Sequence, residues 1–142
     1  MKKREKKKQW WNHIEIEEDP EVKRLMPGIE VKWLITEDTV EGDSMASVNR
    51  CIFPPRSGHC KHLHKDGEEV CYIIKGCLSG GYTDENGENV ETELKPGTAI
   101  FFKKGQVHWV NNSFDEQAEF ISIYFGAPSF NKSGYVEIES GR

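Results

Sequence analysis

Apolar residues at every second position, repeated in many short segments, are the feature that most limits what this chain can fold into. In residues 29–35, the apolar Ile29, Val31, Trp33 and Ile35 alternate with Glu30, Lys32 and Leu34. A repeat of two residues is that of a β-strand with one buried face. No long segment shows the helical repeat of 3.6 residues. We predict further strands at residues 45–53, 59–64, 70–75, 78–83, 90–94, 98–102, 107–111 and 118–125, with shorter ones at 12–17 and 135–138.

Turn-forming residues separate these segments at regular intervals. Asn86-Gly87 marks a tight hairpin, and Lys95-Pro96-Gly97 suits a type II turn. Pro54-Pro55 and Ser57-Gly58 interrupt the chain before the segment at 59–64. Many short strands joined by such turns predict an all-β fold, either a barrel or a sandwich.

Length and charge indicate one domain with a basic arm. The 142 residues carry a net charge of −5, which fits a single acidic domain. Residues 1–8 are strongly basic, and a basic run can bind nucleic acid or anionic lipid. We favour a basic, disordered arm and N-terminal extension at 1–28, a barrel at 29–126, and a C-terminal extension at 127–142 that packs on the barrel or on a partner. An acidic body without a basic patch speaks against nucleic-acid binding.

The sequence predicts a cytoplasmic protein with free thiols. No window approaches the roughly 18 apolar residues of a membrane span, and no apolar stretch follows the basic N-terminus as in a signal peptide. Cys51, Cys60, Cys71 and Cys77 lack zinc-type spacing. We therefore expect four reduced cysteines and no membrane partner.

Three of the five histidines lie in two short segments. His62 and His64 are two residues apart, so a strand would place both imidazoles on one face. Glu68 and Glu69 follow them, and His108 comes later in the chain. Imidazoles with a carboxylate suit divalent iron, manganese, nickel, copper or zinc. A His-x-His pair alone is also found as hydrogen-bonded surface residues.

The spacing of these residues resembles the first motif of the cupin family. That motif has two histidines around one residue, three or four further residues, a glutamate, six residues and a glycine. His62, His64, Glu69 and Gly76 fit this spacing. The gap before Gly76 selects Glu69 over Glu68.

A second cupin motif has Gly, five residues, Pro, one residue, Gly, two residues, His, three residues and Asn. The residues that fit it are Gly97, Gly105, His108 and Asn112. Two turn positions depart from the family. Lys103 stands in place of Pro, and Arg56 stands where a glycine is usual, with Gly58 two residues later. The resemblance covers about residues 29–126.

The resemblance implies a jelly-roll barrel of the double-stranded β-helix type and one divalent ion per chain. The implied metal ligands are His62, His64, Glu69 and His108. Four protein ligands leave two positions of an octahedral ion open to water, dioxygen or a chelating substrate. A closed structural zinc site would use more cysteine.

Strand alternation suggests which side chains line the cavity beside the ion. Cys60 shares the face of the two histidines that follow it, with a small buried hydrophobe as the alternative. Beyond Glu69, alternation places Cys71 and Ile73 on the same face. By strand alternation His59 falls on the opposite face from His62 and His64, so we expect it at the surface or in a loop.

Two other strands contribute possible substrate contacts. Asn49 and Cys51 alternate with Arg50, and alternation alone does not decide which of the three faces the ligand. On the segment 118–125 either set of alternate residues can face inward. If the set with Tyr124 does, its phenol is our hypothesis for a catalytic proton donor.

Three functional hypotheses remain at this point. The first is a metal-dependent enzyme with dioxygenase-, decarboxylase- or isomerase-like chemistry on an oxygenated small molecule. The second is a non-catalytic cupin that binds a metal or a small molecule as a sensor or store. The third is a metal that only stiffens the barrel.

Cupins commonly pair, and aromatic residues lie outside the motifs. These are Trp10, Trp11, Phe130 and Tyr135. We expect a homodimer in which terminal segments pack across the interface.

Overall fold

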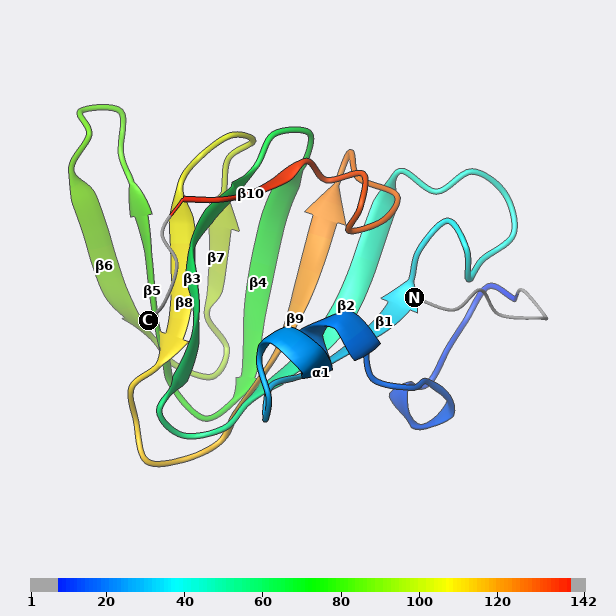
Figure 1. The fold of residues 1–142 in the computed structure, drawn as a ribbon, viewed down its shortest axis with the longest axis horizontal. Helices are drawn as coiled ribbons and strands as arrows, with labels where there is room; N and C mark the ends of the chain where they lie inside the picture. Colours follow the sequence, from blue (N-terminus) through cyan, green and yellow to red (C-terminus); the bar gives the residue numbers. More distant parts are fainter. Residues whose placement is uncertain (1–7, 139–142) are drawn as a thin grey trace.

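The structure is a computed structural model that describes residues 8–138. Two antiparallel sheets of five strands each pack around one core (Figure 1). The elements in chain order are η1 (His13–Glu15), α1 (Pro20–Leu25), β1 (Glu30–Ile35), β2 (Ala46–Phe53), β3 (Ser57–His64), β4 (Glu68–Lys75), β5 (Leu78–Thr83), β6 (Asn89–Leu94), β7 (Ala99–Phe102), β8 (His108–Asn112), β9 (Ala118–Phe125) and β10 (Tyr135–Glu137). The predicted jelly-roll barrel is confirmed. Most of the expected basic arm, residues 1–7, lies outside the described residues.

Strands distant in sequence are neighbours in each sheet. The first sheet has the order β1-β2-β9-β4-β7, and the second has the order β10-β3-β8-β5-β6. The predicted metal ligands therefore come from both sheets. β3 and β8 belong to the second sheet, and β4 belongs to the first.

The inner face of the first sheet follows strand alternation closely. β2 and β9 pair along their full length, and each buries every second residue. On β9 the inward set contains Phe120, Ser122 and Tyr124, which decides the alternative that the sequence left open. On β2 the inward residues include Asn49 and Cys51. The core combines such residues from both sheets, among them Val31, Trp33, Phe53, Ile73, Leu78, Leu94, Phe102 and Phe120.

The N-terminal segment differs from our prediction. The expected strand at 12–17 is wrong, because Asn12 and Glu15 form a capping box around the 3-10 helix η1. The Asn12 side chain accepts from the backbone N–H of Ile14 at 3.0 Å. The short helix α1 was not predicted, although Asp19 caps it and Pro20 occupies its first turn. Its six residues are too few to show a helical repeat.

Both departures from the cupin motifs lie at turns of the chain. Arg56 adopts a φ of 61°, the left-handed region that glycine favours, and is the one non-glycine with positive φ among the described residues. This conformation costs an L-residue about 1–2 kcal/mol, and the guanidinium pairs with Asp115. At Lys103, the backbone N–H donates to Gln106 Oε1 at 3.0 Å, which closes that turn without proline.

Segments before β1 and after β9 both contact strands of the barrel. Before β1, the N–H of Asp19 donates to Val31 O at 2.7 Å, and Trp33 Nε1 donates to Asp19 Oδ2 at 2.9 Å. After β9, the chain returns through β10, where Tyr135 lies opposite His64. α1 and the segment 127–137 thus flank the inward faces of the sheets.

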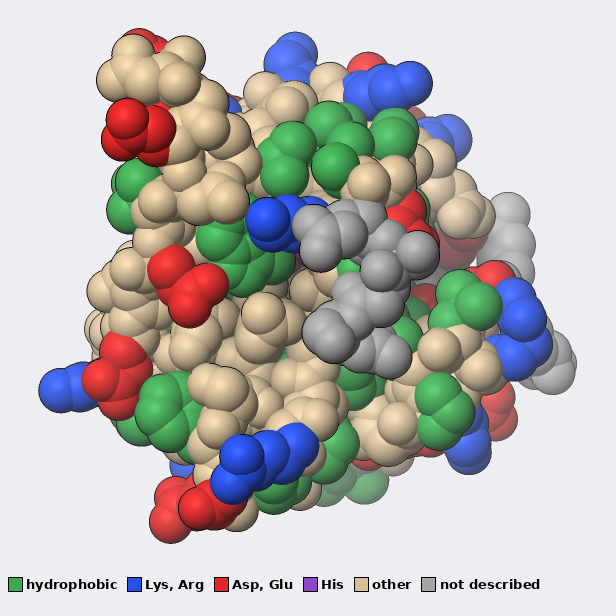
Figure 2. Space-filling view, turned by 60° about the vertical axis from the view of Figure 1, so that its left-hand side comes forward, with side chains coloured by type: hydrophobic (Ala, Val, Ile, Leu, Met, Phe, Trp, Pro, Cys, Tyr) green, Lys and Arg blue, Asp and Glu red, His purple; other side chains and the backbone are tan. Residues whose placement is uncertain are grey.

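The surface carries mixed charge. On the face in Figure 2, acidic and basic side chains are interspersed, and no continuous basic area is visible among its described residues. Across residues 8–138, no helix has the length and apolar character needed to cross a bilayer.

Candidate metal centre

Four buried side chains from three strands converge on one point. His62 and His64 lie on β3, His108 lies on β8, and Glu69 lies on β4 of the opposite sheet. Each offers one ligand atom, and these atoms all lie within 4.8 Å of one another. His62 and His108 are direct cross-strand partners. The structure thus brings together the four residues that the cupin motifs select.

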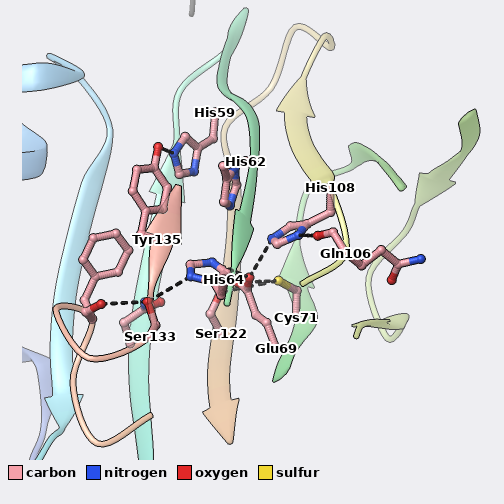
Figure 3. A network of polar contacts seen from close by, with 12 residues as sticks. His59, His62, His64, Glu69, Cys71, Gln106, His108, Ser122, Ser133 and Tyr135 are labelled. Carbon is pink, nitrogen blue, oxygen red and sulfur yellow. Dashed lines mark hydrogen bonds and ion pairs between the residues drawn. The ribbon is translucent and has the colours of Figure 1, made fainter. Parts of the chain in front are cut away.

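Two of the imidazoles are oriented by backbone carbonyls. Nδ1 of His62 lies 2.7 Å from Cys60 O. Nδ1 of His108 lies 2.9 Å from Gln106 O (Figure 3). A carbonyl only accepts, so each Nδ1 carries the proton and donates it. The neutral ring then keeps a lone pair on Nε2, as a metal ligand requires.

The third imidazole is oriented by a distant segment. Nδ1 of His64 lies 2.9 Å from Ser133 Oγ. Ser133 Oγ in turn donates to Phe130 O at 2.7 Å, so it accepts from the histidine. Figure 3 shows this chain of contacts leading away from the cluster. The same tautomer, with the ring proton on Nδ1 and a lone pair on Nε2, therefore results for all three histidines.

One buried nitrogen in the cluster has no hydrogen-bond partner. It is Nε2 of His64, the sole such buried side-chain atom among the described residues. Glu69 Oε1 lies 3.5 Å from this atom and 3.1 Å from Nε2 of His108. Buried polar atoms are almost always satisfied. A divalent cation would satisfy this lone pair and the carboxylate together, so the residues fit a metal ion.

The electrostatics of the cluster favour its metal-binding protonation state. Burial would raise the pKa of Glu69, but the adjacent His108 and His64 outweigh burial and hold that pKa well below its usual value. Burial, with the neighbouring His59 and His108, lowers the pKa of His62 well below 6.5. The site therefore presents a carboxylate and a neutral imidazole at neutral pH.

The predicted thiols behave as neutral hydrogen-bonding groups. Cys71 Sγ lies 3.3 Å from Glu69 Oε2 and 3.4 Å from Ser122 Oγ. Burial, and then the charge of Glu69, raises the pKa of the Cys71 thiol well above its ordinary value. Cys51 donates to Asn49 Oδ1 at 3.0 Å. None of the four cysteines forms a disulfide.

Tyr124 lies beside the cluster. Its ring centroid is 5.0 Å from that of His64, in an edge-on arrangement. Burial, followed by the charge of Glu69, raises the pKa of the phenol well above its ordinary value. The side chain therefore keeps its proton and acts as a hydrogen-bond donor.

His59 is a site residue that strand alternation missed. The expectation of a surface or loop position is wrong, because His59 lines the cavity. Its ring stacks on that of His62 at 4.0 Å, and its Nε2 lies 3.0 Å from Tyr135 Oη. The pairing of β3 with β8 shifts between these two histidines, so residues three apart share a face. A bulge of this kind leaves little signal in a single sequence.

Two of the proposed cavity residues take other positions. Cys60 is half-buried and does not line the cavity, because the same bulge breaks the alternation. Its backbone carbonyl instead orients His62. Ile73 shares the inward face as expected but is fully buried in the core, away from the cavity.

A cavity of about 370 Å³ extends from the cluster towards α1 and the segment 127–137. Asn49, Cys51, Cys71 and Tyr124 line it, as the sequence suggested. Its other walls include Val22, Leu25, Met26, Val31, Trp33, Phe53, Val110, Phe120, Ser122, Phe130 and Tyr135. A small molecule in this space would lie against the open side of a bound ion.

A jelly-roll barrel that encloses three histidines and one glutamate defines a metal-binding protein of the cupin class. The sequence model of that family, described as "Cupin domain", matches residues 49–124, more than half of the chain. The chain belongs to the cupin family.

Curated relatives are plant germin-like proteins. Putative germin-like protein 9-2 of Oryza sativa subsp. japonica is 30% identical over 76 residues, which are 54% of this chain and 36% of that protein. Germin-like protein subfamily 2 member 1 of Arabidopsis thaliana is 28% identical over 78 residues, covering 55% of this chain and 36% of that protein. The match thus spans about a third of the relatives' length.

Solved structures share the fold at low identity. Oxalate decarboxylase from Bacillus subtilis superimposes with a TM-score of 0.78 at 18% identity, covering 93% of this chain and 32% of that chain. Oxalate oxidase in complex with glycolate gives a TM-score of 0.67 at 18% identity, covering 78% and 55%. At this identity the likeness establishes the fold alone.

Proposed function

We propose that this protein is a metal-dependent cupin enzyme acting on an oxygenated small molecule. One divalent ion of iron, manganese, nickel, copper or zinc would be held by His62, His64, Glu69 and His108. The orphaned Nε2 of His64, beside three further ligand atoms, carries this proposal. Dioxygenase, decarboxylase and isomerase reactions all suit such a site. The oxalate enzymes among the structural neighbours support enzymatic chemistry of this general kind.

Bound at these ligands, the ion would supply Lewis-acid or one-electron chemistry. The protein's own part is to fix the ligands and the surroundings of the substrate. Glu69 neutralises half of a divalent charge, and the neutral imidazoles leave the remainder for an oxygen-bearing substrate. Tyr124 keeps its proton and can donate it to oxygen that gains negative charge. The apolar walls exclude water from the reacting groups.

Metal analysis of the purified protein is the first test. We expect about one ion per chain, removable by a chelator and restored by the ion alone. A Glu68→Gln variant is the matched control, because Glu68 is exposed and lies next to the ligand in sequence. Protein that retains no ion under any of the five metals would contradict the proposal.

A second measurement separates an enzyme from a sensor or store. The metal-loaded protein would be incubated with oxygenated small molecules, while oxygen uptake and product formation are followed. Turnover that disappears on metal removal supports the enzyme. Ligand binding without turnover of any bound compound would favour the non-catalytic cupin.

We also propose a cytoplasmic homodimer. Four free thiols fit a reducing compartment. Of the aromatic residues considered for the interface, Phe130 and Tyr135 line the cavity instead, whereas Trp10 is 70% exposed. Light scattering at micromolar concentration would show twice the chain mass for a dimer.

A further inference from the structure

Next to the metal ligands, the polar groups of the cavity are uncharged. Beside the cluster, the inner face of the first sheet presents an amide, two thiols, a hydroxyl and a phenol. These groups belong to Asn49, Cys51, Cys71, Ser122 and Tyr124. Such groups donate and accept hydrogen bonds but do not balance the charge of an anion.

Basic side chains are nearly absent from the cavity. Among its described lining residues, Lys132 is the one lysine or arginine, and its Nζ pairs with Glu37 Oε1 at 2.8 Å. Arg50 lies between the inward-facing Asn49 and Cys51 on β2, so its own side chain points outward. Its guanidinium pairs there with Glu30 at 3.0 Å and with Glu119 at 2.7 Å. A carboxylate that did not touch the ion would therefore have no lysine or arginine beside it except the paired Lys132.

The outer part of the cavity contains several acidic side chains. Asp19 and Glu21 come from the start of α1, and Glu37 and Asp38 come from the loop after β1. A ligand with two negative charges would pass these carboxylates and lose its hydration on entry. Burying an unpaired charge costs several kcal/mol by general estimates.

Most of the remaining wall is apolar and aromatic. The ring centroid of Trp33 lies 5.7 Å from that of Tyr124 and 5.9 Å from that of Phe130. Phe53 and Phe120 form an edge-on pair at 5.1 Å. The volume of about 370 Å³ lies within the usual range for pockets that take ligands of one or more rings. A two-carbon dianion would leave most of this space unfilled.

Charge balance determines the net charge of the ligand group that binds the ion. A divalent ion and the Glu69 carboxylate leave one positive charge, because imidazoles that bind a metal are neutral. A ligand that binds with one negative charge makes the whole site neutral. A dianion would leave one negative charge buried without an unpaired lysine or arginine to balance it. Two neighbouring oxygen atoms would fill the two positions that four protein ligands leave on a six-coordinate ion.

Building on the proposed function, we propose that the site takes a ring-containing, largely apolar molecule that presents two adjacent oxygen donors and binds with a single negative charge. The aromatic wall holds the ring, while Asn49 and Tyr124 are placed to hydrogen-bond the oxygen head. The ligand class thus differs from oxalate, which the names of two structural neighbours contain. Leu25 of α1 and Phe130 of the C-terminal segment lie on the ring-binding wall and determine specificity.

The test uses the full chain loaded with its metal and two probes. The first probe is 4-nitrocatechol, an aromatic diol whose visible absorption shifts on chelation, and the second is oxalate. Metal content is measured first, so a failure of the proposed function shows as absent metal before any probe is added. We expect 4-nitrocatechol to bind at least about tenfold more tightly than oxalate, which is a difference of about 1.4 kcal/mol in binding free energy.

Substitutions in the aromatic wall distinguish the contribution of the ligand's ring from that of its oxygen donors. Phe130→Ala should weaken 4-nitrocatechol about tenfold and leave oxalate binding and metal content unchanged. Leu25→Ala is the second variant, because Leu25 is 57% exposed and its loss should not disturb folding. Phe101→Ala, on an exposed position of β7 outside the cavity, is the control. Tighter binding of oxalate, or equal binding of 4-nitrocatechol by both wall variants and wild type, would overturn the ligand class while leaving the metal site in place.

Discussion

The two sheets contribute different chemistry to the same centre. The second sheet supplies all three imidazoles, from β3 and β8. The first sheet supplies one carboxylate, Glu69, and a row of uncharged polar groups on β2, β4 and β9. The nitrogen donors thus set where an ion sits, while the opposite face sets its net charge and the surroundings of a substrate. Neither sheet alone would form the site.

The supports of the ligands differ as well. His62 and His108 are each oriented by the carbonyl two residues earlier, so the support is built into their own strands. His64 depends on Ser133, sixty-nine residues away. Glu69 is held from across the barrel by the histidines it faces. The four ligands should therefore respond differently to substitution.

The largest expected effect comes from removing two donors of the second sheet. The double variant His62→Ala/His108→Ala leaves one imidazole and one carboxylate, too few to hold a divalent ion against water. We expect bound metal to fall from about one ion per chain to none detectable by elemental analysis. His13→Ala, which removes an imidazole outside the cluster, should keep the full content. Metal retained by the double variant would place the site elsewhere.

Removing the charge of the first sheet should have the next largest effect. Glu69→Gln keeps the size of the side chain but removes the negative charge, so metal affinity should fall steeply. Glu68→Gln should be close to wild type, because that carboxylate is exposed. Calorimetric titration with the preferred ion measures both. Equal losses for the two variants would show that the motif spacing selects the wrong glutamate.

Acid should release the metal and its stabilisation of the fold. The ordinary pKa values are 6.5 for His62 and 4.5 for Glu69, and both are lowered in the folded protein. Between its ordinary and its lowered pKa, each group binds a proton more readily in the unfolded chain. Stability therefore falls as pH decreases below 6.5 and again below 4.5, and protons displace the metal over the same range.

Melting curves of loaded and metal-free protein measure this effect. With free ion at 100 times its dissociation constant, binding stabilises the fold by about 2.7 kcal/mol, or roughly 5–10 °C in Tm for a chain of this size. We expect this difference at neutral pH and convergence of the two curves in acid. If the curves coincide at every pH while the loaded form holds one ion per chain, the metal does not stabilise the fold, and a purely structural role is excluded.

The smallest expected effect tests the distant support of His64. Ser133→Ala removes the acceptor that fixes the imidazole tautomer. Loss of such an outer partner typically lowers metal affinity about 10- to 100-fold. The matched control is Ser129→Ala. Ser129 lies in the same segment, but its hydroxyl accepts from Lys132 N and not from a metal-ligating histidine. Wild-type affinity in Ser133→Ala would mean that the β3 backbone alone orients His64.

The parts of the fold that alternation and motif spacing describe were predictable from the sequence. The barrel, most strand positions and the convergence of the four ligands are examples. The β3 bulge was not predictable. The extra residue between His59 and His62 alters which face of the strand His59 occupies, and no residue type in the sequence marks this shift. Nor was Ser133, because contact between positions 64 and 133 depends on how the C-terminal segment returns to β3. Asp19-Pro20 is a typical start of a helix, but α1 is too short to show the apolar repeat of 3.6 residues, so the helix was not predicted.

The wall that we expect to hold a ligand's ring comes partly from outside the matched family region. α1 precedes residues 49–124, and the segment with Phe130 follows them. New ligand preferences can therefore be introduced by exchanging residues 20–25 or 128–132, in evolution or in the laboratory, while the chelating strands stay untouched. Ser133 is the position in that returning segment that any such exchange has to keep, because one histidine takes its orientation from it.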